Sequence, residues 1–522
     1  MKTRTSANWV VVLLVLTGCN RDAANKQARS ADQSPVGTLS PATRQPPPTV
    51  ATNAILISVD TLRPDVLTPY DNKIKTSPNL AQFAKDAALF TDAISQGAST
   101  AISHKSLLYS LYPWITGMTE KNMVPHEKGP SPLETLQGAG IFTGAILGGA
   151  QLSAVYGFNK GFDTFLETSR DTRRGIRNAR KTLAEVQAAA AEREPIRRAR
   201  LAAKRDGKPA PNFPRQSRDR TRGGMTPAEF EPLSLEILEE DSMAWLDEHH
   251  QKPFFLFLHT YKVHCPYSPP QEYVNQFVAP YNGPVDPSDC RGLYQRVLDE
   301  ADLIYLRQMY MSEVAYVDEF LGRFFAKLKE LGIYGNTIIA LVSDHGESFG
   351  EHGRLGHNRL DWSMIRVPLI IKVPGFQGTR IDAPVELVDV MPTVFAALGV
   401  SAPYRFQGLN LLPVIKGEQQ ADPNRLRFSN QVERTAVLKG DWKLVFTDAE
   451  NKALYNWRTD PRELKNVLKS NPDIAAELRK DFDRMLTDNK GVAKNFVQQA
   501  LPKPEISDAL REQLEALGYI DG

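Results

Sequence analysis

The sequence predicts an α/β protein built on a doubly wound, largely parallel β-sheet, and two observations lead to this fold class. Short, nearly continuous apolar runs recur along the chain, as in strands that are buried on both faces of a sheet. Segments with helical periodicity lie between these runs, and parallel sheets require that alternation. The 522 residues, 42% of them hydrophobic, are enough for a large core.

Five apolar runs are the predicted strands. They cover residues 53–60, 143–149, 253–261, 336–346 and 368–375. The first run ends on Asp60, and the fourth ends with Asp344 and His345. In a parallel α/β sheet, ligands bind outside the carboxyl ends of the strands, so these polar residues mark the expected site.

Two segments between the runs predict helices. In residues 77–90, Ser77 can cap a helix with Pro78 in its first turn, and the apolar face would extend as far as Ala87. Residues 306–331 carry apolar side chains at steps of three and four, which is the period of an amphipathic helix.

The N-terminus predicts an exported lipoprotein. Lys2 and Arg4 precede an apolar run, residues 9–18, which is too short to span a membrane and suits a secretory signal. "LTGC" then resembles a bacterial lipobox, in which Cys19 is lipidated; the alternative is a plain signal peptide with an incidental cysteine. We expect a signal peptide at 1–19 and a lipid anchor on the periplasmic side of the outer membrane or at the cell surface.

A tether and a basic segment interrupt the α/β pattern. Residues 20–50 are rich in Ala, Ser, Pro, Gln and Thr and predict a disordered tether. The net charge is only +2, yet residues 168–223 hold 17 Lys and Arg against 6 Asp and Glu. We interpret 168–223 as an insertion that is either a solvated basic face or a docking arm for a polyanion. Residues 168–212 contain no aromatic side chain, so no base stacking and no specific nucleic-acid binding are expected.

Asp60, Asp344 and His345 together predict a divalent-metal site. A lone Asp at a strand end would more often cap the next turn. Two such ends, one with an adjacent histidine, instead favour a cation with open coordination positions. A metal in such a site polarises an ester oxygen and activates a hydroxyl.

The segment "STAISHKS", residues 99–106, offers the hydroxyl for that chemistry. Thr100 is either a helix N-cap or a nucleophile. A helix that begins here would favour an anionic ester near its N-terminus.

Several longer stretches resemble the sulfatase family within the alkaline phosphatase superfamily. They include "AILISVDTLRPDVL", "TSPNLAQFAKDAALFTDAIS", "LVSDHGESFGEHG", "IRVPLIIKVPG" and, near the end, "LKGDWKLVFTDAENKALYNWRTDPRELKNV". The resemblance implies a sheet of the alkaline phosphatase/sulfatase type with a small C-terminal antiparallel subdomain. It places the catalytic domain at 51–415, the subdomain at 416–490 and a tail at 491–522.

The resemblance also implies residue roles. "TAISH" stands where sulfatases carry C/S-x-P-S-R, so Thr100 takes the position of the residue that becomes formylglycine, and Thr cannot follow that route. Relatives that cleave phosphoesters use an unmodified Thr there, with one metal held by residues that match Asp60, Thr100, Asp344 and His345. Ser103 and His104 occupy substrate-binding positions of the motif.

Other positions refine this reading. His264 and His357 match positions that contact the anion, protonate the leaving group or bind a second metal. Arg63 follows Asp60 closely and is a candidate for substrate binding. Thr61 replaces a second Asp, so Mn or Zn competes with Ca as the single divalent metal, and a second metal stays open.

The combined prediction is a metal-dependent hydrolase or transferase of sulfuric or phosphoric esters, with phosphoester chemistry favoured by Thr100. Two alternatives stay open: a conventional sulfuric ester hydrolase, and a catalytically dead binding lipoprotein on the same fold. Apart from Cys19, the chain has only Cys265 and Cys290, and the sequence leaves their pairing open.

Overall fold

The computed structural model describes residues 51–71, 73–117, 126–127, 131–167, 235–431, 433–494, 496–497, 506–517 and 519. All of them belong to one compact unit, residues 47–522. The predicted signal peptide with Cys19, the predicted tether and the basic segment 168–223 all lie outside the described residues.

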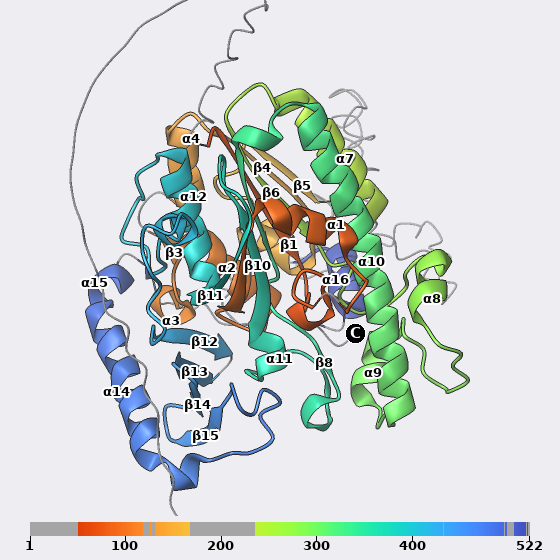
Figure 1. The fold of residues 1–522 in the computed structure, drawn as a ribbon, viewed down its shortest axis with the longest axis vertical. Coiled ribbons are helices and arrows are strands. Elements are labelled where there is room, and N and C mark those ends of the chain that lie inside the picture. Colours follow the sequence, from red (N-terminus) through yellow and green to blue (C-terminus); the bar gives the residue numbers. More distant parts are fainter. Residues whose placement is uncertain are drawn as a thin grey trace, which may run out of the picture. The chain divides into compact units, whose positions relative to one another are not determined.

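An eight-stranded sheet forms the centre of the described structure (Figure 1). Its strands, in spatial order, are β11 (Thr379–Glu386), β2 (Ala88–Ile94), β10 (Arg366–Lys372), β7 (Thr337–Val342), β1 (Asn53–Val59), β6 (Phe254–Thr260), β4 (Phe142–Leu147) and β5 (Thr164–Glu167). Strand β10 is antiparallel to both of its neighbours, and every other neighbouring pair is parallel. The predicted largely parallel α/β sheet is therefore confirmed.

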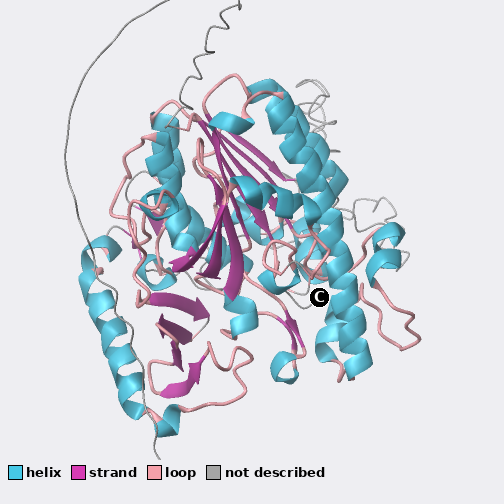
Figure 2. Ribbon diagram, in the orientation of Figure 1, coloured by secondary structure: helices cyan, strands magenta, loops and turns pink. Residues whose placement is uncertain are grey.

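Helices cover both faces of this sheet (Figure 2). One face packs on α2 (Thr100–Tyr109), α4 (Pro132–Gly138) and α12 (Val390–Leu398), and the other on α1 (Pro78–Phe83), α7 (Leu235–His249) and α10 (Glu300–Glu330). Along β1, Ala54 and Leu56 face the first layer, whereas Ile55 and Ile57 face the second. This alternation explains why the strand sequence is apolar at every position.

The predicted helix in residues 77–90 is shorter than its apolar pattern indicates. Helix α1 ends at Phe83, a single 3₁₀ turn follows, and strand β2 begins at Ala88. The residues after that turn pair with β10 and β11, and their side chains alternate between the two core layers, with Phe90 in the first and Leu89 in the second.

A four-stranded antiparallel sheet confirms the predicted C-terminal subdomain. Its strands are β12 (Arg427–Gln431), β13 (Arg434–Lys439), β14 (Trp442–Phe446) and β15 (Asn451–Asn456). Helix α14 (Pro472–Asp488) packs against it, with the rings of Phe446 and Phe482 5.1 Å apart.

Shorter elements complete the described chain. They are α3 (Pro113–Thr116), α8 (Gln271–Phe277), α9 (Cys290–Gln295), α11 (Trp362–Ile365), α13 (Leu412–Ile415), α15 (Lys490–Ala493), α16 (Asp508–Ala516), β3 (His126–Glu127), β8 (Ser348–Phe349), β9 (Leu355–Gly356) and β16 (Phe496–Val497). A disulfide joins Cys265, in the loop after β6, to Cys290 at the start of α9, which settles the pairing that the sequence left open. No helix among the described residues is long and apolar enough to cross a membrane.

Candidate metal centre and active site

Adjacent strand ends bring the first three site residues together. Strand β1 pairs in parallel with β6 and β7, so all three strands end at the same edge of the sheet. Asp60 follows β1 directly, and Asp344 and His345 follow β7. His345 Nε2 lies 3.5 Å from Asp344 Oδ2 and 3.8 Å from Asp60 Oδ1.

Thr100 joins this group from the start of helix α2. Ser99, not Thr100, occupies the N-cap position, and its side chain makes no capping bond. The Thr100 hydroxyl instead donates to Asp60 Oδ2 over 3.2 Å and lies 3.5 Å from His345 Nε2. The structure thus brings together the four residues for which a metal site was predicted.

Burial strongly perturbs the charges of these residues. Loss of solvent raises the pKa of Asp60 and also that of Asp344, where the nearby Asp60 adds to the effect. Burial alone would lower the pKa of His345, but Asp344 and Asp60 outweigh it and raise that pKa. A cation bound between the two carboxyl groups would oppose this effect and favour their charged forms.

The ligand atoms of the cluster that have no hydrogen-bond partner fit a divalent cation. Asp60 Oδ1 and Asp344 Oδ2 are buried without a hydrogen-bond partner, which is costly unless something else satisfies them. Ligand atoms of Asp60, Asp344 and His345 lie within 4.8 Å of one another. The Nδ1–H of His345 donates to the Gly346 carbonyl, so its Nε2 lone pair faces the cluster. Hard oxygens with one imidazole suit manganese, zinc or calcium.

A shell of buried groups holds the first residues in place. His104 lies between the Thr100 carbonyl, 2.8 Å from its Nδ1, and the Ser58 hydroxyl, 2.8 Å from its Nε2. Ser103 donates to the backbone carbonyl of Asp344 over 2.7 Å. Both side chains are fully buried, so their contacts serve to position the cluster; their predicted part in substrate binding stays a prediction. His259, whose Nε2 lies 3.4 Å from Asp60 Oδ2, completes this shell.

A second group of ligand-type residues borders the first. His264, Glu347 and His357 have ligand atoms within 4.8 Å of one another, and the rings of His345 and His357 are 4.7 Å apart. Both carboxylate oxygens of Glu347 are buried without a hydrogen-bond partner. Burial raises the pKa of Glu347 and lowers that of His264 to about 4. His264 and His357 are thus placed together at the site.

The sequence reasoning missed two residues of this region, Glu347 and Tyr519. Glu347 lies two positions after His345, and its acidic side chain within "DHGE" was the available signal. Tyr519 comes from the tail, and its hydroxyl lies 3.0 Å from Thr100 Oγ1. No local pattern in the sequence linked that tail to the strand ends.

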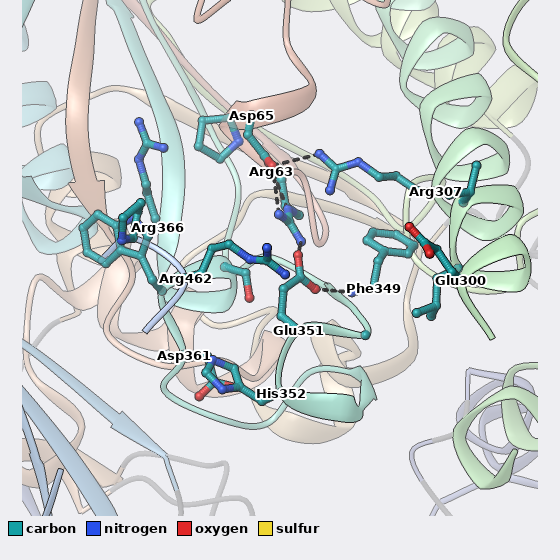
Figure 3. Close-up of a pocket in the computed structure, with 17 residues that line it drawn as sticks. Arg63, Asp65, Glu300, Arg307, Phe349, Glu351, His352, Asp361, Arg366 and Arg462 are labelled. Carbon is teal, nitrogen blue, oxygen red and sulfur yellow. Dashed lines mark hydrogen bonds and ion pairs between the residues drawn. The ribbon is translucent and has the colours of Figure 1, made fainter. Parts of the chain in front are cut away.

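Arg63 lies in a neighbouring pocket instead of facing the carboxylate cluster. Its guanidinium forms ion pairs with Asp65 and Glu351, both at 2.8 Å, as Figure 3 shows. The pocket has a volume of about 630 Å³, and Arg307, Arg366 and Arg462 also line it. Arg63 therefore has two carboxylate partners already, and its predicted role with substrate stays a prediction.

The comparisons with known proteins identify the family. The family model described as "Sulfatase" matches residues 52–400, and a second model, "N-sulphoglucosamine sulphohydrolase, C-terminal", matches residues 350–490. The chain belongs to the sulfatase family.

Curated relatives carry both sulfatase and broader names. The chain is 27% identical over 302 residues to the "Multifunctional alkaline phosphatase superfamily protein PehA" of Trinickia caryophylli, covering 48% of this chain and 58% of that protein. It is also 27% identical over 240 residues to an "Arylsulfatase" of Clostridium perfringens, covering 42% of this chain and 50% of that protein. The matches thus span little more than half the length of these relatives.

Solved structures share the fold of this sulfatase-family chain. The phosphonate monoester hydrolase of Agrobacterium radiobacter superposes with a TM-score of 0.63 at 20% identity, covering 84% of this chain and 96% of that chain. The phosphonate monoester hydrolase of Silicibacter pomeroyi gives a TM-score of 0.61 at 21% identity, covering 84% and 94%. At this identity the likeness shows the fold alone.

Proposed function

We propose that this sulfatase-family chain is a metal-dependent hydrolase of anionic esters that uses the Thr100 hydroxyl as its nucleophile. The observation that carries the proposal is the placement of Thr100 Oγ1, 3.2 Å from Asp60 and 3.5 Å from His345, within a buried carboxylate cluster. A helix cap would not require that placement, and Ser99 holds the cap position.

Asp60, Thr100, Asp344 and His345 would hold one divalent cation. When bound there, the cation would lower the pKa of the Thr100 hydroxyl and neutralise charge on the ester. Asp60 accepts the hydrogen bond of that hydroxyl and so orients its oxygen. His104 positions Thr100 through a hydrogen bond to its backbone carbonyl. Ser103 positions Asp344 in the same way, by donating to the Asp344 carbonyl.

The chemistry that follows favours phosphoric or phosphonic esters. The Thr100 oxygen attacks phosphorus, the P–O bond to the alcohol breaks, and the alcohol leaves with a proton. Water then cleaves the Thr100–O–P bond and restores the hydroxyl. Thr100 lacks the aldehyde hydrate that a formylglycine offers, so sulfuric ester hydrolysis is the second candidate; the family membership supports it. If an alcohol replaces water, the same intermediate makes the protein a transferase.

A test compares turnover of aryl phosphate monoesters and diesters, aryl phosphonates and aryl sulfates, with added Mn, Zn or Ca. The proteins are the wild type, Thr100→Ala and a matched control, Ser99→Ala. We expect metal-dependent phosphoester turnover that falls more than about 1,000-fold in Thr100→Ala and stays near wild type in Ser99→Ala. Sulfate turnover that persists in Thr100→Ala would show that the nucleophile is another residue.

We further propose a second metal position at His264, Glu347 and His357. The orphaned Glu347 carboxylate and the proximity of the two clusters support it. Elemental analysis of the metal-loaded protein should find two ions per chain in the wild type and one in Glu347→Gln. One ion in both proteins would refute the second position.

We also propose that the protein is exported and anchored by a lipid on Cys19. The disulfide between Cys265 and Cys290 supports an oxidising compartment, since such bonds are rare in the cytosol. Palmitate labelling of the wild type and Cys19→Ser should give a labelled and an unlabelled protein. The basic segment 168–223 would then be available to a polyanion, which its deletion tests.

A further inference from the structure

The C-terminal segment is docked on the catalytic unit by an apolar helix face. Ser507 caps helix α16, and its side chain accepts from the Leu510 backbone N–H over 3.2 Å. Leu510, Leu514 and Leu517 recur at helical spacing and are all buried in the first core layer. This packing holds Leu517, two residues before Tyr519, in a defined position.

The loop after β4 makes room for this segment. The backbone N–H of Ala150 donates to the Gln513 side chain over 3.3 Å. Gly149 has a φ of +77°, and a Cβ there would lie 3.3 Å from the same Gln513 oxygen.

Tyr519 then places its hydroxyl between two candidate catalytic residues. The oxygen lies 3.0 Å from Thr100 Oγ1 and 3.3 Å from His264 Nε2. Its ring contacts those of His264 and His357, at centroid distances of 5.5 and 6.0 Å. The side chain is half-buried, so it borders the site and also reaches solvent.

The hydrogen-bond pattern leaves the Tyr519 proton available. A tyrosine hydroxyl has one O–H donor. His264 donates its Nδ1–H to the Cys265 carbonyl, so its Nε2 offers only a lone pair to Tyr519. When no cation is bound at His264, the Tyr519 O–H therefore donates toward His264 or Thr100, and when one is bound there it can donate toward Thr100. Oxygens of an anion that reacts with Thr100 come within reach of the same donor.

We propose that Tyr519 is a further catalytic residue, whose hydroxyl donates a hydrogen bond to a non-bridging oxygen of the ester anion at Thr100. The inference rests on the proposed function, since it takes Thr100 as the reacting group. It assigns part of the anion recognition to the segment that follows α16. The donor is strongest when charge gathers on that oxygen, which is the condition for lowering the barrier.

The test uses the full, metal-loaded protein as wild type, Tyr519→Phe and the matched control Tyr305→Phe. Tyr305 lies on α10 and stacks on Tyr281 with ring centroids 4.0 Å apart, so its variant loses the same oxygen atom from a different tyrosine pair. Two quantities are measured: kcat/KM for an aryl phosphate, and the affinity for orthovanadate by calorimetry. Thermal melting checks that both variants are folded.

We expect Tyr519→Phe to lower both quantities about 10- to 100-fold, because a hydrogen bond to a charged oxygen is lost, while Tyr305→Phe leaves both unchanged. Unchanged vanadate affinity and turnover in Tyr519→Phe would overturn the assignment. Faster turnover would also overturn it, since the tail would then obstruct the site.

The outcomes separate this inference from the proposed function. If the wild type turns over no ester, the proposed function fails, and vanadate binding still decides the role of Tyr519. If turnover persists in Thr100→Ala but is lost in Tyr519→Phe, the nucleophile was misplaced and Tyr519 still serves the anion.

Discussion

Asp60 and Asp344 are two buried carboxyl groups with histidines beside them but, among the described residues, with no ion pair to a lysine or an arginine. Their pKa values rise because burial removes water from both and because they face the same small volume. Such a pair is costly in the metal-free protein and becomes favourable only when a cation binds. These site residues therefore lower the stability of the metal-free protein.

The first prediction concerns Asp344→Asn. The amide keeps the shape and the contact with the Thr61 backbone N–H but removes a buried charge. We expect the metal-free variant to melt at a higher temperature than the metal-free wild type, and to lose the rise in melting temperature that Mn or Zn gives the wild type.

Asp389→Asn is the matched control for this prediction. Asp389 is also buried, but it binds the Arg425 guanidinium at 2.6 Å, so removal of its charge takes away one of the two carboxylate partners of Arg425 and leaves Glu386 at 3.0 Å as the other. We expect this variant to melt at a lower temperature. A metal-free Asp344→Asn protein that melts as low as Asp389→Asn would contradict the argument.

The sequence could indicate Asp60, Asp344 and His345 because each follows an apolar run, and parallel strands end at one edge. Thr100 required the comparison of motifs, since a threonine before a helix is more often a cap. Glu347 and Tyr519 could not be placed this way. One sits in an irregular loop and the other depends on tertiary contact across 419 positions.

At the scale of elements, the apolar runs predicted which segments form buried strands but did not predict whether those strands are parallel or antiparallel. Strands β1, β4, β6, β7 and β10 lie within two residues of their predicted bounds at the N-terminal end. An apolar run of the same kind predicted β10, yet β10 is antiparallel to both of its neighbouring strands. An apolar run indicates that both faces of the strand are buried. The direction of the strand depends instead on the path of the segments that connect it to its neighbours.

The second prediction concerns the contact between β4 and α7. Gly144 lies on β4, and a Cβ added there would come within 2.5 Å of the Trp245 ring. The ring is buried and donates its indole N–H to Thr164, so it cannot move freely. We expect Gly144→Ala to lower the free energy of unfolding by about 1–3 kcal/mol, measured by urea denaturation.

Gly138→Ala is the control for that substitution. A Cβ at Gly138 would meet nothing within 4 Å, at the end of helix α4. The control should therefore unfold like the wild type or at slightly higher urea. Equal destabilisation by both changes would point to a general effect of alanine and against the Trp245 contact.

At the scale of the whole molecule, stability should depend on pH through Glu313 of α10. Burial raises the pKa of Glu313 to about 7, despite the opposing Lys262 and the hydrogen bond from the Ser268 backbone N–H. The folded protein therefore holds this proton up to about pH 7, whereas the unfolded chain releases it near pH 4.5.

The third prediction follows from that difference in proton binding. Between about pH 4.5 and 7 the folded state binds more protons, so the contribution of Glu313 to stability falls as pH rises through this window. Urea denaturation of metal-free protein at several pH values should show a smaller fall for Glu313→Gln than for the wild type. Parallel curves for the two proteins would exclude Glu313 as the cause.

The wide spacing of the site residues has a consequence for how the protein is made. Thr100 and its partner Tyr519 are 419 positions apart, and Asp344 lies 283 positions after Thr61. A nascent chain on the ribosome therefore carries Asp60 and Thr100 long before the residues that complete their surroundings exist. The site is complete only after Tyr519 has been made, so a chain interrupted before residue 519 lacks the Tyr519 contact altogether.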